Sequence, residues 1–405
     1  MHHASMPAVG IIGGGGTGSA LAWDLALRGF RVSLFEQGEF TSGTTGRHHG
    51  QLHSGARYAV GDRLIARECM QETLILRRIV PQAIEYNGGF FVALNEQEAA
   101  YGDQFVTACN EAGIPARDIP PAQALRVEPV INPAALRTVW VPDGSFDAFR
   151  VPASFLAAAR RLGASLRPFT TVTGISVHNG RIQALTVLDA GRQEQELAFD
   201  YVVNAAGAWA GACGRLAGVT IPVTPAAGAM LAVQGRLSDM VISRLAPPGD
   251  GDIIVPQRGL SIIGSTQRRA ESADGLLPLP EEAAFLLKRA DELVPGFSAN
   301  KKHAVWAAAR PLAGWAADDG RSISRDVVLV DHAAEGVEGF LSIVGGKATV
   351  LRAMAEQAAD RVCAYFGYSI ACRTAQYRLP EWAELYRRIP PGDWTAQNPG
   401  LELLP

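Results

Sequence analysis

Three glycines near the start of the chain have the spacing that binds nucleotide phosphates. Gly13, Gly15 and Gly18 form a G-x-G-x-x-G motif within residues 8–36, AVGIIGGGGTGSALAWDLALRGFRVSLFE. In such a motif one glycine permits the tight turn, one lets backbone N–H groups approach a pyrophosphate, and one lets the helix pack closely on the strand. Because glycine-rich turns are common, the motif needs support from its surroundings.

The surrounding residues are typical of the elements that position a bound dinucleotide. Residues 8–12 are an apolar run, residues 17–28 have a helical pattern, and Gly29 can end that helix in a left-handed conformation. Residues 31–36 are typical of a second strand whose last residue, Glu36, can bind a ribose diol. Strand, glycine turn, helix N-terminus and carboxylate together predict a dinucleotide site. They do not distinguish FAD from NAD.

The bulk composition limits the function classes. The chain has 405 residues, 48% of them apolar, which predicts two domains with large cores. A net charge of −3 argues against nucleic acid as a partner and against strong attraction to anionic lipid. Five scattered cysteines without a C-x-x-C pair predict reduced thiols and no metal or iron–sulfur site. With no apolar run of about 18 residues and no signal sequence, we expect a cytoplasmic protein without a transmembrane segment.

The rest of the chain alternates between two predicted units. Residues 41–58, rich in glycine and hydroxyl side chains, are expected to wrap a ligand, with a flexible connector as the alternative. Residues 62–80 predict an amphipathic helix, and the prolines of residues 115–133 predict a linker. YVVNAAG at 201–207 predicts a buried strand whose small residues lie against a ligand, and residues 219–309 predict an antiparallel sheet. Residues 326–366 then repeat the pattern of strand, glycine turn and helix, so the first unit is expected to be discontinuous.

Several uncommon strings resemble the FAD-dependent glycerol-3-phosphate dehydrogenases, and most of all the catalytic large subunit of the bacterial anaerobic enzyme. In chain order they are GRHHGQLHSGARYAV at 46–60, ARECMQE at 66–72, VPDGSFDAFR at 141–150, VVNAAGAW at 202–209, ARPL at 309–312, SRDVVLVDH at 324–332 and GFLSIVGGKAT at 339–349. The resemblance covers about residues 8–370 and indicates membership of the glycine/D-amino-acid oxidase (DAO) flavoprotein superfamily.

The resemblance implies a fold, a cofactor and a reaction. The fold is α/β (α+β overall), with a Rossmann-like FAD-binding domain at 1–85, 150–218 and 326–380, an antiparallel-sheet substrate domain at 86–149 and 219–325, and a tail at 381–405. The cofactor is FAD. The reaction is oxidation of sn-glycerol 3-phosphate to dihydroxyacetone phosphate, with hydride passing from C2 to flavin N5 and electrons leaving to a quinone or an electron-transfer partner.

Two other functions stay open. One is a related FAD enzyme acting on a 2-hydroxy acid such as L-2-hydroxyglutarate, or on an amine or amino acid. The other is a flavin subunit whose main role is electron relay within a larger complex. Since no second G-x-G-x-x-G motif appears, a nicotinamide site is not expected.

The resemblance also assigns residues that would bind an anionic substrate. Arginine and lysine side chains match phosphate oxygens, and the matching positions are Arg57, Tyr58, Arg310, Arg325 and Lys347. Each cation alone could equally be a surface charge.

The proton of the substrate hydroxyl needs an acceptor. His53 is the candidate base, with a purely structural histidine as the alternative, and Arg310 could instead stabilise the developing alkoxide.

A larger set of residues is expected to contact FAD. His49 matches a family histidine, while His48 stands where the closest relatives have asparagine; a covalent histidine link is the alternative to their noncovalent binding. The expected contacts are Gly13, Gly15, Gly16, Thr17, Gly18, Glu36, Gln37, Thr44, Thr45, Arg47, His49, Ala206, Gly207, Gly345, Gly346, Lys347, Ala348 and Thr349.

The sequence differs from the family that it resembles at two points, which bear on the substrate and on the partners. Ala227 stands where close relatives carry lysine. The sequence also lacks the helical domain of the aerobic enzyme and the cysteine-rich domain of the anaerobic large subunit. Trp382, Tyr386 and Trp394 near its end are expected to pack on the body, with docking of a partner protein or peripheral contact with the inner face of the membrane as the alternative.

Overall fold

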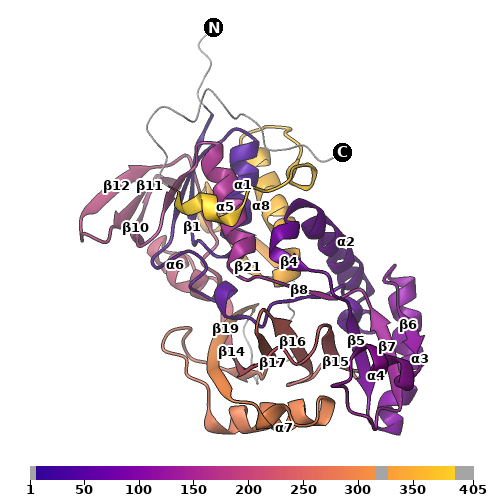
Figure 1. Ribbon diagram of the computed structural model, residues 1–405. Helices are drawn as coiled ribbons and strands as arrows, with labels where there is room; N and C mark the ends of the chain where they lie inside the picture. Colours follow the sequence, from indigo (N-terminus) through magenta and orange to yellow (C-terminus); the bar gives the residue numbers. More distant parts are fainter. Residues whose placement is uncertain (1–5, 315–326, 388–405) are drawn as a thin grey trace.

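The computed structural model describes residues 6–314 and 327–387 (Figure 1). Its first large sheet has six strands in the order β20–β21–β13–β1–β2–β9. Five of them are parallel, and β20 runs antiparallel to β21 at one edge. The strands are β1 (Ala8–Ile12), β2 (Arg31–Phe35), β9 (Ser165–Arg167), β13 (Tyr201–Asn204), β20 (Val327–Asp331) and β21 (Phe340–Gly345).

Alternate residues of the parallel strands face two different layers. Val9 and Ile11 of β1 pack with the helices α1 (Gly16–Leu27), α5 (Arg150–Arg161) and α8 (Leu351–Tyr365), which lie together beside the sheet in Figure 1. Ala8 and Ile12 face the other way, toward α6 (Ala210–Leu216) and a small antiparallel sheet. Because successive side chains of a strand point to opposite faces, burial on both sides explains why these strands are apolar throughout.

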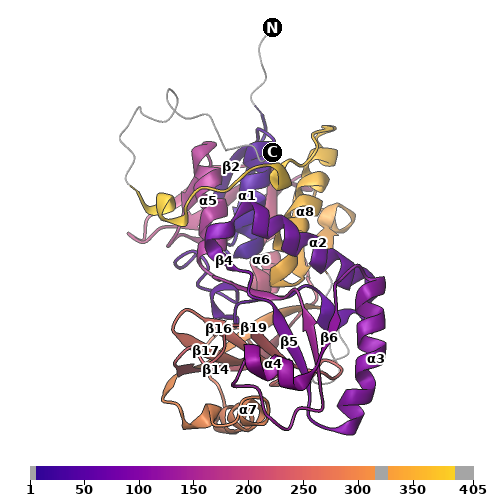
Figure 2. The same cartoon turned by 45° about the vertical axis from the view of Figure 1, so that its right-hand side comes forward.

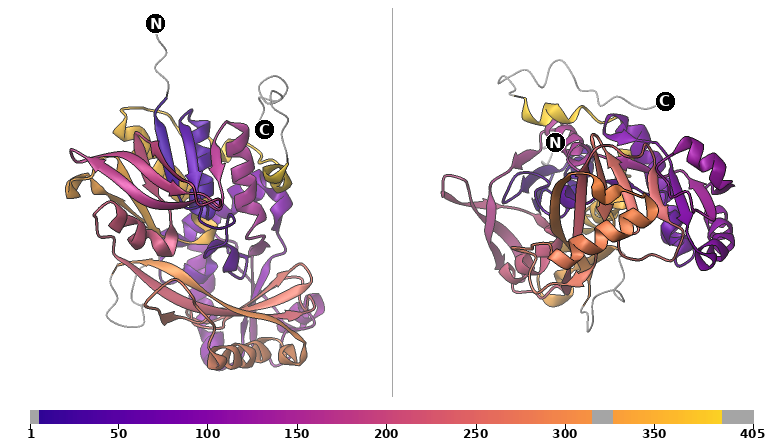
Figure 3. Two further views of the ribbon diagram at one scale, coloured as in Figure 1. Left: turned by 90° about the vertical axis from the view of Figure 1, so that its left-hand side faces the viewer. Right: turned by 60° about the horizontal axis from the view of Figure 1, so that its bottom comes forward.

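A second large sheet has nine strands of mostly antiparallel orientation. Its order is β18–β14–β17–β16–β15–β5–β7–β6, and β19 pairs with β14. Helix α7 (Pro280–Leu293) packs on its far face, below the rest of the molecule in Figure 3 (left). The strands are β5 (Gly89–Ala93), β6 (Arg117–Ile119), β7 (Arg137–Val141), β14 (Val223–Gln234), β15 (Val241–Arg244), β16 (Ile253–Gln257), β17 (Leu260–Gly264), β18 (Arg268–Arg269) and β19 (Lys302–Ala313).

Two three-stranded sheets and three more α-helices lie in the described residues, besides several short 3₁₀ helices. The small sheets are β10 (Thr171–His178), β11 (Arg181–Leu188) and β12 (Glu194–Ala198), and β3 (Gln51–Leu52), β8 (Gly144–Phe146) and β4 (Ile84–Glu85). The helices are α2 (Arg63–Ile79), α3 (Glu96–Glu111) and α4 (Pro121–Val127). Figure 2 shows α2 running from the first sheet toward α3, which lies beside β5 and β6.

The elements agree with most of the sequence patterns and contradict one. Asp62 caps α2 by accepting a hydrogen bond from the Ile65 N–H at 3.0 Å, and Asn179 and Gly180, both with positive φ, turn the β10–β11 hairpin. The linker predicted at 115–133 is wrong, because β6 and α4 form there and β6 pairs with β7. The strands of the two large sheets fall within the separate ranges assigned to the two domains; the domain division itself stays a prediction.

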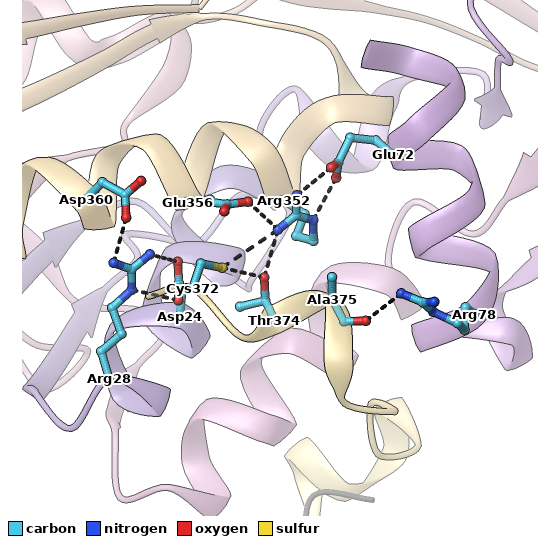
Figure 4. A network of polar contacts seen from close by, with 10 residues as sticks. All are labelled: Asp24, Arg28, Glu72, Arg78, Arg352, Glu356, Asp360, Cys372, Thr374 and Ala375. Carbon is cyan, nitrogen blue, oxygen red and sulfur yellow. Dashed lines mark hydrogen bonds and ion pairs between the residues drawn. The ribbon is translucent and has the colours of Figure 1, made fainter. Parts of the chain in front are cut away.

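A network of ion pairs, some of them buried, ties helices from distant parts of the chain together (Figure 4). Arg352 of α8 donates to both carboxylate oxygens of Glu72 on α2 and, at 2.9 Å, to the Thr374 hydroxyl. Arg28 pairs with Asp24 at 3.0 Å and with Asp360 at 2.7 Å, which joins the end of α1 to α8. These contacts fix α8, and therefore the glycine turn in front of it, against α1 and α2.

Candidate active site

A cavity of about 710 Å³ lies between the two large sheets. The ends of β1, β13 and β21 border it on one side, and β14, β17 and β19 border it on the other. The glycine-rich stretch of residues 42–58 lines it as well. Ligands of open parallel sheets bind at the carboxyl ends of the strands, which is where this cavity lies.

The first glycine turn has no room for side chains. A Cβ atom at Gly13 would lie 2.6 Å from the Ala205 carbonyl oxygen, and one at Gly18 would lie 2.0 Å from the Gly13 carbonyl oxygen. Gly13 also has φ of +108°, a conformation that favours glycine. Gly18 therefore serves the packing of α1 on the turn and does not line the cavity, whereas Gly13 and Gly15 do.

Glu36 and Thr45 organise the backbone around the start of α1. The Glu36 carboxylate accepts hydrogen bonds from the Gly14 N–H at 2.8 Å and the Gly38 N–H at 3.0 Å, and its side chain borders the cavity. The Gly16 N–H donates to the Thr45 hydroxyl at 2.9 Å. The glycine-rich stretch is thus bound to the helix N-terminus rather than extending into solvent.

The same stretch is also attached to the second sheet. Thr44 donates through its hydroxyl to the Ala309 carbonyl at 2.6 Å, and Trp306 donates through its indole N–H to the Arg47 carbonyl at 2.7 Å. Ala309 and Trp306 belong to β19. Residues 41–58 therefore bridge the two sheets across one wall of the cavity.

A second glycine turn closes the cavity from the end of β21. Gly345 and Gly346 have φ of +83° and +87°, and a Cβ at Gly346 would lie 2.2 Å from the sulfur of Met354 on α8. Lys347, Ala348 and Thr349 follow and line the cavity. The turn brings the N-terminal end of the α8 segment, with its positive dipole, to the cavity wall.

Three histidines of the glycine-rich stretch border the cavity and are uncharged at neutral pH. Burial lowers the pKa of His48 to about 4, and burial together with the charges of Lys347 and Arg57 lowers the pKa of His53 to about 3. Burial, with the neighbouring charges of Arg57 and Arg310, also holds the pKa of His49 well below its ordinary value. A neutral imidazole can accept a proton.

Three of the cations that line this cavity, besides Arg47, come from distant parts of the chain. Lys347 Nζ lies 5.3 Å from the centre of the Tyr58 ring, and that ring lies 5.2 Å from the ring of His53. Arg57 donates to the Gly249 carbonyl at 2.8 Å, and Arg310 donates to the Thr266 carbonyl at 3.1 Å and to the Ser265 hydroxyl. A Cβ at Gly228 would lie 2.5 Å from Arg310 Nη1, so this glycine makes room for the guanidinium group.

The structure brings nearly all the sequence-predicted site residues to one cavity. Those that line it are Gly13, Gly15, Gly16, Thr17, Glu36, Gln37, Thr44, Thr45, Arg47, His49, His53, Arg57, Tyr58, Ala206, Gly207, Arg310, Gly345, Gly346, Lys347, Ala348 and Thr349. Gly18 lies behind the turn, and Arg325 lies outside the described residues. Ala227 is fully buried in β14 and is not among the lining residues.

Sequence reasoning missed several lining residues. Ser265, which holds Arg310, follows a strand in the string SIIGST, and Met230 belongs to an apolar run. The change from apolar to hydroxyl side chains at the end of a strand is the signal that could have indicated Ser265. Met230 carries no such signal, because an apolar strand residue can face a core or a ligand equally well.

The residues of the cavity fit a flavin dinucleotide. The glycine turn at the start of α1 has no side chains, which leaves backbone N–H groups near the cavity. Glu36 borders the cavity just after β2, where a ribose is expected. Among the described residues, the hydroxyl oxygen of Thr349 and Nε2 of His48 are buried without hydrogen-bond partners beside this cavity. In the described part of the chain, no three His, Cys, Asp or Glu side chains group closely enough to hold a metal ion.

This architecture is that of a dinucleotide-dependent oxidoreductase in which cofactor and substrate meet between a parallel sheet and a second, mostly antiparallel one. A family model described as FAD dependent oxidoreductase (DAO) matches residues 8–360. The chain therefore belongs to the DAO family of FAD-dependent oxidoreductases, which confirms the expected fold class, the enzyme class and FAD as the cofactor.

Individual relatives agree with this assignment. One subunit of the anaerobic glycerol-3-phosphate dehydrogenase of Escherichia coli K12 is 41% identical over 377 residues, 91% of this chain and 69% of the relative. The corresponding subunit of the Haloferax volcanii enzyme is 39% identical over 389 residues, 92% of this chain and 66% of the relative. The chain thus spans about two thirds of the length of these curated relatives.

A solved structure with low sequence identity shares the fold. Glycerol-3-phosphate dehydrogenase from Bacillus halodurans, complexed with FAD, matches with a TM-score of 0.71 at 21% identity, covering 92% of this chain and 68% of that chain. Among residues 6–314 and 327–387, no helix has the length and apolar character needed to cross a bilayer.

Proposed function

We propose that this chain oxidises sn-glycerol 3-phosphate to dihydroxyacetone phosphate. The observation that carries the proposal is the gathering of Arg57, Arg310 and Lys347 in the cavity that His53 also lines, where the charges of Lys347 and Arg57 act on the His53 ring. A phosphate dianion requires cations of this kind, and arginine forks match its oxygens. The names of relatives at 38–41% identity support the same substrate.

Each residue has a defined role in the proposal. Arg57, Arg310 and Lys347 bind the phosphate and orient the alcohol, and Arg325 would join them from outside the described residues. His53 accepts the proton of the C2 hydroxyl, and Arg310 stabilises the oxygen as that proton leaves. FAD, when bound, supplies the two-electron acceptor for the hydride from C2.

Substrate binding would adjust His53 for this role. Burial lowers the pKa of its ring most, and the charges of Lys347 and Arg57 lower it further. A bound phosphate dianion offsets both charges, so the pKa of His53 rises when substrate is present. The imidazole therefore becomes a stronger base in the complex than in the free enzyme.

The electrons would then leave to a quinone or to a partner electron carrier. The relatives are named as single subunits of an enzyme, which supports a partner for those proteins, and we extend this arrangement to the present chain. The segment at 382–386 packs on α5, where Arg161 pairs with Glu384 at 2.5 Å, which favours a packing role for this part of the tail over partner docking. Trp394 lies outside the described residues.

Anaerobic stopped-flow reduction of the bound flavin tests the proposal directly. We expect glycerol 3-phosphate to bleach the flavin absorbance rapidly, while L-2-hydroxyglutarate, glycine and sarcosine do not. Rapid bleaching by the hydroxy acid or by an amine, with none by glycerol 3-phosphate, would overturn the proposed substrate.

A further inference from the structure

A buried carboxylate lies close to the candidate base without bordering the cavity. Asp143 belongs to the string VPDGSFDAFR and lies between β7 and β8, with 1% of its surface exposed. It is not among the residues that line the cavity. Any effect on the reaction must therefore act through a neighbour.

Asp143 binds the segment that carries His53 at two points. Oδ1 accepts hydrogen bonds from the backbone N–H and the hydroxyl of Ser54, both at 2.7 Å. Oδ2 accepts one from the side-chain amide of Gln51 at 2.9 Å. The carboxylate thus holds the residue after His53 and, on the other side, the residue two positions before it.

The ring of His53 is placed through this backbone rather than through its own Nδ1. The His53 carbonyl accepts a hydrogen bond from the Thr73 hydroxyl at 3.0 Å, whereas Nδ1 is buried without a hydrogen-bond partner among the described residues. The edge contact with Tyr58 is a ring contact and not a hydrogen bond. The hydrogen bonds that Asp143 accepts and the one that Thr73 donates therefore hold the backbone that carries the imidazole, and the Tyr58 ring packs against its edge.

The charge environment of Asp143 agrees with this arrangement. Burial raises the pKa of the carboxyl group, while the hydrogen bonds from Ser54 and Gln51 and the charge of Arg57 act in the opposite direction. Arg57 is also one of the cations that lower the pKa of His53. Arg57 thus acts on both the Asp143 carboxyl group, which lies behind the cavity lining, and the His53 imidazole, which is part of that lining.

We propose that Asp143 is a positioning residue for the oxidation: it holds residues 51–54 so that the His53 imidazole meets the hydroxyl group of the bound alcohol. The inference rests on the proposed function, in which His53 accepts the proton. A displacement of a reacting group by about 1 Å can slow an enzyme by roughly 100-fold.

Two substitutions separate geometry from charge. Asp143→Ala removes all three hydrogen bonds. Asp143→Asn keeps an oxygen for Ser54, and the Gln51 amide can turn to present its own oxygen to the new amide group. We expect flavin reduction by glycerol 3-phosphate to slow by about 10- to 100-fold in Asp143→Ala and by less than about 3-fold in Asp143→Asn.

Asp147 provides the matched control within the same string. Its carboxylate accepts the N–H groups of Phe149 and Arg150 at the start of α5 and pairs with the exposed Arg258. In a His53→Ala background, Asp143→Ala is expected to cause no further loss of reduction rate, because the group that it positions is absent. Asp147→Ala is expected to have the same proportional effect in both backgrounds.

A crystal structure of the flavin-bound Asp143→Ala protein gives a readout independent of activity. We expect residues 51–54 and the His53 ring to be displaced, with FAD affinity unchanged. The inference is overturned if the ring keeps its place or if the losses from Asp143→Ala and His53→Ala multiply. Absence of any bleaching by glycerol 3-phosphate would instead contradict the proposed function, and the crystal structure would then decide the positional claim.

Discussion

The cations of the cavity affect the protonation of the histidines beside them. Burial is the largest cause of the lowered pKa of His53, and the charges of Lys347 and Arg57 follow. The groups that would bind a phosphate therefore add to the effect of burial in keeping the candidate base neutral. Single substitutions can separate these two effects.

Removing the charge of Lys347 should move the pH dependence of the reaction. In Lys347→Met the pKa of His53 rises toward its ordinary value of 6.5 because one of the charges that lower it is lost. The acid limb of the profile of kcat/KM against pH is then expected to shift to higher pH. The measurement is steady-state kinetics with an artificial dye as acceptor.

The control for this experiment is Lys288→Met, on the exposed side of α7. It removes the same charge away from the cavity and should leave the acid limb in place. An unchanged profile in Lys347→Met would mean that His53 is not the group that titrates.

Loss of the Arg310 guanidinium should weaken substrate binding more than flavin binding. Hydrogen bonds to charged groups contribute about 1.5–3 kcal/mol, so Arg310→Met is expected to raise the Kd for glycerol 3-phosphate by about 10- to 100-fold. The concentration dependence of flavin reduction measures this Kd. Arg258→Met, at a side chain that is 66% exposed, serves as the control. An unchanged Kd in Arg310→Met would remove Arg310 from the substrate site.

At the level of single residues, the sequence could predict candidates but not their assembly. Arg57, Arg310 and Lys347 are separated by up to 290 positions (347 minus 57), and only their surrounding strings indicated a common site. The closeness of Gly228 to Arg310, and the hydrogen bond that Arg310 donates to Ser265, depend on the pairing of β14 with β19 and β17. Such pairings between distant strands have no local signal in the sequence.

The first glycine turn should tolerate no methyl group at Gly18. The added Cβ would lie 2.0 Å from a backbone oxygen, so turn and helix α1 would have to move apart. Gly18→Ala is expected to lose FAD binding and to lower the Tm clearly, measured by flavin fluorescence and calorimetry. Gly259→Ala, where no atom of the described residues lies within 4 Å of the new Cβ, should resemble the wild type. Normal flavin content in Gly18→Ala would show that the turn can adapt.

The histidines of the glycine-rich stretch should make the flavin-free protein sensitive to acid. In the unfolded chain each takes up a proton near pH 6.5, but in the folded protein His48 does so only near pH 4 and His53 near pH 3. The unfolded state binds more protons between these values, so stability falls as the pH falls from about 6.5 to 4. Calorimetric Tm values across this range should show a smaller decrease in His48→Asn and His53→Asn. Equal slopes in all three proteins would contradict this explanation.

Helices and strands formed as predicted where the sequence has a clear apolar periodicity. The apolar periodicity of residues 62–80 predicted α2 to within one residue at each end. The proline-rich stretch at 115–133 failed because Pro121 occupies the first turn of α4, where proline is tolerated, and β6 is stabilised by its partner β7 rather than by its own residues. Pro121 thus marks the start of a helix, whereas the sequence pattern was interpreted as the absence of regular structure.

The buried ion pair of Arg352 and Glu72, drawn in Figure 4, should contribute to the stability of the whole molecule. Arg352 and Glu72 have side chains only 6% and 4% exposed, and removing one partner of such a pair typically costs about 3–5 kcal/mol. Arg352→Met is therefore expected to lower the free energy of unfolding by about this amount, measured by urea denaturation. Arg181→Met, which breaks the exposed pair with Glu338, should have little effect. Comparable losses in both variants would contradict a special role for burial.

At the scale of the whole molecule, the sequence predicts that the FAD-binding unit is discontinuous. The prediction rests on a pattern of strand, glycine turn and helix that occurs near both ends of the chain. The order β20–β21–β13–β1–β2–β9 could not be predicted, because it depends on which buried strands fit beside β1. The cavity between the sheets could not be predicted either. It depends on where the paired strands β14 and β19 lie relative to the glycine-rich stretch.

The pairing of β1 with β13, and of β13 with β21, has a consequence for biosynthesis. Strand β1 leaves the ribosome before the other strands of its sheet, and β2 on one side follows soon after. Its neighbour on the other side, β13, follows almost 200 residues later, and β21, which precedes the second glycine turn, more than 300 residues later. At about 5–20 residues per second, the nascent chain waits on the order of tens of seconds with β1 incompletely paired. Flavin loading is therefore a late event, and a chaperone that shields the exposed strand edge during translation should raise the yield of yellow protein.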